Sequence, residues 1–117
     1  MIDLSKSQKK VARELITLGL QRECKSFTAQ VKEFTNSQEW ETEDPHQFYL
    51  KLYKDVITFD KHIGKRYDNL GGSRYFMTVF GLFYDGILTT DDIAGFSTEV
   101  QNELLRIKQL YDNDLEG

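Results

Sequence analysis

The sequence has little proline and cysteine and no long apolar run, and each scarcity excludes a class of structure. One proline and eight glycines in 117 residues argue against an all-β or disordered chain. The lone Cys24 excludes an internal disulfide and argues against a cysteine-rich zinc site. The amino terminus lacks the apolar core of a signal peptide, and no apolar stretch is long enough to cross a bilayer. We therefore expect a cytoplasmic protein that does not span a membrane.

Basic charge is also in short supply. The chain has 15 Lys and Arg residues against 19 Asp and Glu residues, a net charge of −4. No global positive field attracts nucleic acid, so we do not expect nucleic acid to be the main partner. The length matches one domain, and we expect a single helical domain over residues 1–117 with a frayed tail at 112–117.

The most apolar stretch is Arg74–Leu88, RYFMTVFGLFYDGIL. Its large apolar and aromatic residues point in every direction around a helix, which is typical of a helix buried on nearly all sides. The stretch predicts a central buried helix at about 74–86. Every other segment has one apolar stripe that could pack against it. We therefore predict an all-α fold, a four- to five-helix bundle, mostly antiparallel and packed around this central helix.

The first helix is expected over residues 5–36, with Ser5 as its cap. Its apolar stripe changes face at Gly19, and the two halves would lie on roughly opposite sides of a continuous helix. Continuity is favoured because no proline or strong new cap follows Gly19, and the alternative is a break there that folds both halves onto one core. The apolar residues are Leu4, Val11, Leu15 and Leu18 before Gly19 and Leu20, Cys24, Phe27, Val31 and Phe34 after it.

The two opposite apolar stripes of this helix must each pack against another surface, and the domain's own core can bury only one of them. A second copy related by two-fold symmetry is the commonest way to cover the other, so we predict a homodimer through helix 5–36. The candidate partner surface consists of Phe27, Val31, Phe34 and Trp40. Trp40 lies in the polar stretch Asn36–Glu43, which predicts a loop. It is interpreted either as a lid on the core edge or as an exposed anchor for a partner.

Asp44-Pro45 is the clearest helix start, and it opens a predicted helix at 44–68. Asp60 falls inside the apolar stripe of this helix, so it is expected to be buried and paired, hydrogen-bonded or protonated. The candidate polar or ligand site combines Asp60 with Tyr53 and Arg74, and it is interpreted either as a structural link or as a small-molecule or anion site. The apolar stripe itself consists of Tyr49, Leu52, Val56, Phe59, Ile63 and Tyr67.

Nucleic-acid binding is the alternative function. The lysine face of helix 44–68 carries Lys51, Lys54, Lys61 and Lys65. The stretch 90–108, TDDIAGFSTEVQNELLRIK, resembles a helix-turn-helix motif, although its link is about three residues shorter than usual. Its would-be recognition helix carries Glu99 and Glu103, which phosphate repels. Ser97 and Thr98 offer a further helix cap, so the stretch is expected to form one helix, or a short helix followed by a long one.

No catalytic, cofactor or metal site is expected. Glu43 and His46 match one copy of the E-x-x-H motif of di-iron bundles, which need two copies and two further glutamates. Cys24 lies on an apolar stripe and is expected to be a buried, inert thiol. By elimination, the sequence favours a non-enzymatic cytoplasmic helical interaction module that binds a protein partner or itself. Nucleic-acid binding and a ligand site near Asp60 and Arg74 are the alternatives.

Overall fold

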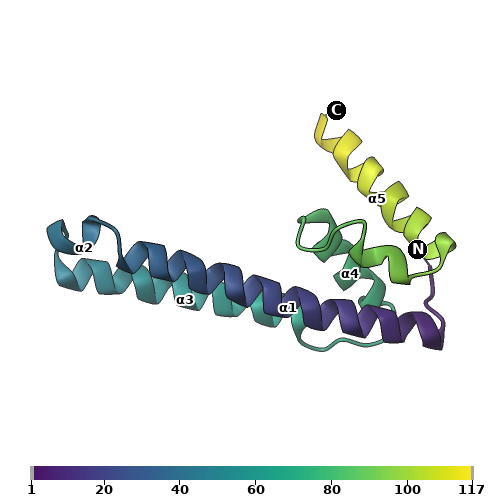
Figure 1. Ribbon diagram of the computed structural model, residues 1–117, viewed down its shortest axis with the longest axis horizontal. Helices are drawn as coiled ribbons and strands as arrows, with labels where there is room; N and C mark the ends of the chain where they lie inside the picture. Colours follow the sequence, from purple (N-terminus) through teal and green to yellow (C-terminus); the bar gives the residue numbers. More distant parts are fainter. Residues whose placement is uncertain (1, 117) are drawn as a thin grey trace. The chain divides into compact units, whose positions relative to one another are not determined.

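The computed structural model describes residues 2–116, and all regular structure within them is helical (Figure 1). The elements in chain order are α1 (Lys6–Thr35), α2 (Glu39–Thr42), α3 (Pro45–Tyr67), α4 (Arg74–Tyr84), the 3-10 helix η1 (Asp92–Gly95) and α5 (Thr98–Glu116). No strand occurs among the described residues, and the predicted all-α helical bundle is confirmed.

Side-chain caps set the beginnings of two long helices. The Ser5 hydroxyl accepts the N–H of Gln8 at 3.3 Å, which caps α1. The Asp44 carboxylate accepts the backbone N–H groups two and three residues further on, at 2.8 and 3.2 Å, and Pro45 occupies the first turn of α3. The Gln8 side chain accepts the N–H of Ser97 at 2.8 Å and so joins the start of α1 to the start of α5.

Three features at the ends of elements were expected from the sequence. The predicted loop Asn36–Glu43 contains one helical turn, α2. The tail, expected to fray from 112, is helical through Glu116, where Lys108 and Asp112 form an i,i+4 ion pair at 3.1 Å; Gly117 lies outside the described residues. The helix-turn-helix-like stretch forms the short 3-10 helix η1 followed by the long helix α5, which is one of the two arrangements expected for it.

The fold divides into two compact units. We call the first the core unit, which comprises the chain up to Gly19 together with the chain from Asn69 onward. We call the second the hairpin, which comprises Leu20–Asp68 and so contains the second half of α1, α2 and α3. The single domain expected over residues 1–117 stays a prediction, and each unit is described by itself.

Within the core unit, α4 is buried on nearly all sides, as predicted. Phe80 is 3% exposed and packs edge-on against the ring of Tyr111 at 5.2 Å, while Met77 on the same helix is 36% exposed. The core-unit residues with buried side chains are Ala12, Leu15, Ile16, Phe76, Val79, Phe80, Leu82, Phe83, Leu88, Ile93, Phe96, Val100 and Leu104, with Thr78 as the buried polar residue.

Gly19 does not interrupt α1, which confirms the predicted continuous helix. The residue is buried, and a Cβ atom built on it would lie 2.7 Å from a δ-methyl of Leu82. Leu82 is itself fully buried, so its methyl groups have no free space to rotate into. The glycine therefore serves close packing between α1 and α4 and not a change of chain direction.

We predict that Phe80→Ala lowers the free energy of unfolding by roughly 3–5 kcal/mol, because it leaves a cavity in a packed core. Urea unfolding followed by circular dichroism measures this change. Met77→Ala is the matched control on the same helix and should cost less than half as much. Equal losses for the two variants would contradict the position of the core.

A second prediction concerns Gly19. In the wild-type background Gly19→Ala should destabilise the chain, since overpacking costs about 1–3 kcal/mol and outweighs the helix-propensity gain of about 1 kcal/mol. In a Leu82→Val background, which lacks the δ-methyls, the same substitution should be neutral or stabilising. A double-mutant cycle of urea midpoints tests this, and additive effects would show that the two residues do not compete for space.

Candidate interaction surface on the helical hairpin

The two long helices of the hairpin pack along a heptad seam. The α3 residues on this seam follow one another at alternating steps of four and three: Phe48, Leu52, Asp55, Phe59, His62 and Arg66. Phe48 stacks on Phe34 of α1 at a ring distance of 4.2 Å, and Phe59 stacks on Phe27 at 4.1 Å. These contacts leave Phe27 and Phe34 half-buried, and they hold the two helices at close range.

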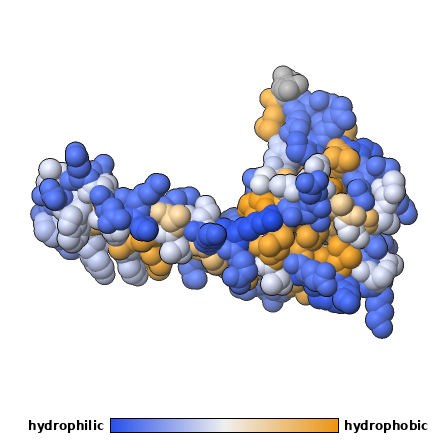
Figure 2. Space-filling view, viewed as in Figure 1, coloured by the Kyte–Doolittle hydropathy of each residue, from blue (hydrophilic) through white to orange (hydrophobic). Residues whose placement is uncertain are grey.

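A second heptad stripe runs along α3, one residue out of phase with the seam and so about 100° around the helix. It begins with Tyr49, Tyr53 and Val56, which are 57%, 55% and 43% exposed. Asp60 follows and is also exposed. We call these four residues the outer stripe. In Figure 2 apolar atoms reach the surface of the hairpin along the side formed by α3.

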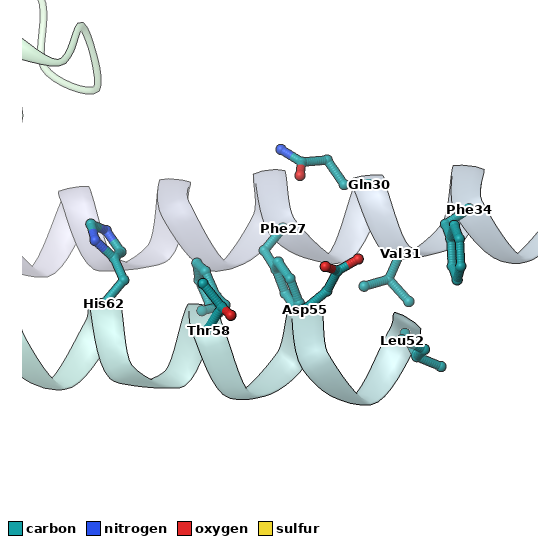
Figure 3. Close-up of a pocket in the computed structure, with 9 residues that line it drawn as sticks. Phe27, Gln30, Val31, Phe34, Leu52, Asp55, Thr58 and His62 are labelled. Carbon is teal, nitrogen blue, oxygen red and sulfur yellow. The ribbon is translucent and has the colours of Figure 1, made fainter. Parts of the chain in front are cut away.

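An open groove lies between α1 and α3. Its volume is about 340 Å³, and Figure 3 shows side chains from both helices around it. The lining combines aromatic and aliphatic groups with a few polar ones: Phe27, Gln30, Val31, Phe34, Leu52, Asp55, Thr58, Phe59 and His62. The residues of the outer stripe do not line it, so the hairpin presents two separate surfaces.

The far end of the seam holds a polar cluster centred on Glu23 of α1. The Glu23 carboxylate, only 9% exposed, lies 2.7 Å from His62 Nε2 and 3.0 Å from an Arg66 guanidinium nitrogen. The Tyr67 hydroxyl donates to its other oxygen at 2.5 Å. Three side chains of α3 thus form hydrogen bonds or ion pairs with one buried carboxylate of α1. A buried charge is stable only when it has such partners.

The pKa values of the cluster reflect these contacts. Burial alone would raise the pKa of Glu23, but the hydrogen bonds from Tyr67 and His62 and the positive charge of Arg66 outweigh it and hold that pKa below its usual range. Burial, together with the hydrogen bond to Glu23, raises the pKa of Tyr67 well above that of a free phenol. The ionised carboxylate and the protonated phenol therefore stabilise one another.

The structure gives three of the predicted partner-surface residues a role inside the chain. Phe27, Val31 and Phe34 lie half-buried against α3, so the second stripe of α1 already has a cover. The premise that this stripe needs a second copy is therefore wrong. Trp40 is 59% exposed and touches Phe48 edge-on at 5.4 Å, so it lies on the rim of the hairpin and stays accessible.

The expected burial of Asp60 is wrong. Asp60 and Tyr53 are both exposed and lie on the outer stripe, where solvent hydrates the carboxylate. Arg74 is exposed at the start of α4 and belongs to the core unit. The carboxylate that is held by donors is Glu23, which sequence reasoning missed. A signal was present, because Glu23 lies between Leu20 and Phe27 at the spacing of the apolar stripe.

Two further expectations about the hairpin are revised. Cys24, expected to be buried, is exposed on α1 because the seam passes through Glu23 and Phe27 on either side of it. On the lysine face, Lys51 pairs with Glu43 at 2.7 Å, while Lys54, Lys61 and Lys65 are exposed. Part of the positive charge on that face is thus neutralised within the chain.

Neither a membrane-spanning helix nor a metal cluster occurs in the part of the chain that the structure describes. None of its helices is long and apolar enough to cross a membrane. No three or more His, Cys, Asp or Glu side chains among residues 2–116 converge on a position that could hold a metal ion. Comparison of the chain with family models, with curated proteins and with solved structures gave no match.

The Glu23 cluster predicts a specific acid sensitivity. The folded pKa of Glu23 lies below the ordinary value of 4.5, so its ionisation adds stability that is complete above that pH and is lost as the pH falls through the folded pKa. Urea midpoints measured from neutral pH down to roughly pH 3 should therefore fall more steeply for the wild type than for Glu23→Gln. Parallel pH profiles would contradict this role.

Tyr67→Phe provides the second arm of that experiment. At neutral pH it should cost about 1–3 kcal/mol, since a buried carboxylate loses a donor. Because this change raises the pKa of Glu23, the acid loss of stability should begin at a higher pH than in the wild type. Tyr75→Phe removes a phenol hydroxyl from the core unit, outside both the cluster and the outer stripe, and is the matched control that should leave the profile unchanged.

Proposed function

We propose that the chain is a non-enzymatic interaction module that associates with a second copy of itself through the outer stripe of α3. The observation that carries this proposal is the exposure of Tyr49, Tyr53 and Val56 at heptad spacing on one face of a long helix. Tyrosines on a rigid helix supply large contact areas at low entropic cost, which is typical of interface residues.

The sparse core of the hairpin supports the same proposal. Phe48 is its single buried side chain among the described residues, whereas the core unit buries more than a dozen. Two helices alone enclose little apolar surface, and a unit of this size gains stability when further helices cover it. Two hairpins paired through α3 would form a four-helix arrangement with the outer stripes in its interior.

The order of residues along the outer stripe supports a second copy as the occupant. In an antiparallel pair of helices related by a two-fold axis, residue i of one copy faces residue j of the other, and i + j is the same for every facing pair. At a sum of 109, Tyr53 faces Val56 of the second copy, and Tyr49 faces Asp60. Each apolar residue then meets an apolar surface, and the phenol of Tyr49 meets a carboxylate that can accept its hydrogen bond. The outer stripe is thus complementary to the outer stripe of a second copy.

Two other features of the surface agree with this assignment. The exposed thiol of Cys24 suits a reducing compartment, which supports the expected cytoplasmic location. Nucleic-acid binding receives less support, because the net charge is −4 and Lys51 is paired within the chain. In the proposed dimer the lysine face is therefore exposed to solvent.

We predict that Tyr53→Lys converts a dimer to a monomer. The change removes a central aromatic contact and brings two positive charges near the two-fold axis, so the dissociation constant should rise by at least tenfold, or about 1.4 kcal/mol. Sedimentation equilibrium at tens of micromolar measures the association directly. A wild-type chain that is monomeric under these conditions would overturn the proposed self-association.

Ala29→Lys is the matched control for this experiment. Ala29 is exposed on α1, two residues and so about 200° from Phe27, which faces α3. The substitution adds the same charge to the hairpin but away from the outer stripe, and association should be unchanged. If Ala29→Lys and Tyr53→Lys weaken association equally, general charge repulsion and not the stripe is responsible.

A further inference from the structure

The groove of the hairpin lies between two stacked phenylalanine pairs. Phe34 with Phe48 and Phe27 with Phe59 stand seven positions apart on α1, which corresponds to about 10 Å along the helix. Between them the smaller Val31 fills less of the space between the helices, and the groove of about 340 Å³ opens there (Figure 3). That volume falls within the range of small-molecule sites, about 300–1,000 Å³.

One carboxylate lines the groove. It belongs to Asp55, neither lysine nor arginine is among the lining residues, and the ring of His62, which also lines the groove, contacts Glu23 at 2.7 Å. Figure 3 shows the Asp55 carboxylate directed into the space between the helices, toward Phe27 and Val31 of α1. Within residues 2–116 it forms no salt bridge, although it occupies a seam position that is usually apolar. An uncompensated carboxylate beside aromatic walls favours a cation with an apolar body and disfavours an anion.

We propose that this groove binds a small organic cation, an ammonium group carried on an aromatic or branched aliphatic body. The apolar body would lie against Phe27, Val31 and Phe34, where its burial supplies most of the affinity. The ammonium group would lie at Asp55, with the hydroxyl of Thr58 as a further hydrogen-bond acceptor. The volume of the groove, about 340 Å³, suits a small molecule better than a long docking helix.

The site is independent of the proposed self-association. None of the outer-stripe residues lines the groove, which is formed by seam residues of α3, by Thr58 and by residues of α1. A ligand in the groove leaves Tyr49, Tyr53 and Val56 free. Failure of one proposal therefore has no bearing on the other, and the monomeric variant Tyr53→Lys should bind the cation as the wild type does.

The test uses three probes of matched size: 2-phenylethylammonium, the neutral 2-phenylethanol and the anion 3-phenylpropionate. Amide chemical shifts of the full-length ¹⁵N-labelled chain are followed by NMR during titration. The ammonium probe should give saturable shifts in residues 27–34 of α1 and 52–62 of α3, with weaker binding of the alcohol and none of the anion. Equal binding of cation and anion, or shifts that do not saturate, would overturn the proposal.

Two variants make the assignment specific. Asp55→Asn keeps the shape of the groove, and it should raise the dissociation constant of the ammonium probe roughly threefold to fivefold without affecting the alcohol, as expected for an exposed ion pair. Val31→Phe fills the hollow and should weaken both probes. An unchanged affinity of the ammonium probe for a folded Asp55→Asn variant, verified by its NMR spectrum, would defeat the role of Asp55 even if Val31→Phe does not fold.

Discussion

One buried carboxylate sets the register of the helical hairpin. A heptad seam repeats every seven residues, so two helices joined by apolar contacts alone could slide by one repeat and still pack. Glu23 removes this freedom because its three donors, His62, Arg66 and Tyr67, occur together only once along α3. A slide would leave a buried charge without partners, which costs several kcal/mol. We infer that the cluster contributes specificity of pairing more than net stability.

The surfaces of the hairpin are consequences of that register. With Glu23 held at its donors, Phe27 meets Phe59 and Phe34 meets Phe48. The seam then uses one stripe of α3, and the stripe one residue out of phase has no cover within the hairpin. Because α3 has two apolar faces and the hairpin provides only one neighbouring helix, one face is buried and the tyrosines on the other are exposed.

Local signals in the sequence predicted the elements well. Ser5 and Asp44 cap the helices that they were expected to begin, and the apolar stretch around Phe80 forms the most buried helix. These features depend on residues within one or two turns of each other, which periodicity and capping describe directly. Gly19 shows where local signals stop being informative, because its role depends on contact with Leu82, a residue distant in sequence.

Pairing between helices was the part that the sequence could not supply. An apolar stripe shows that a face needs a cover but not which segment provides it, so Phe27 and Phe34 were assigned to a second copy although α3 covers them. Asp60 was singled out because the two stripes of α3 are adjacent and were taken as one broad face. Once the seam is known, the unusual carboxylates are Glu23 and Asp55.

The contrast between these two seam carboxylates explains why the hairpin has a groove. Glu23 has donors within reach and is buried, whereas Asp55 forms no salt bridge among the described residues and remains exposed. An ionised group without partners must keep its hydration, so the helices cannot close over Asp55 as they close over the stacked rings. The hollow beside Val31 thus leaves the Asp55 carboxylate open to solvent, and the proposed cation would supply the partner that the described residues of the chain do not.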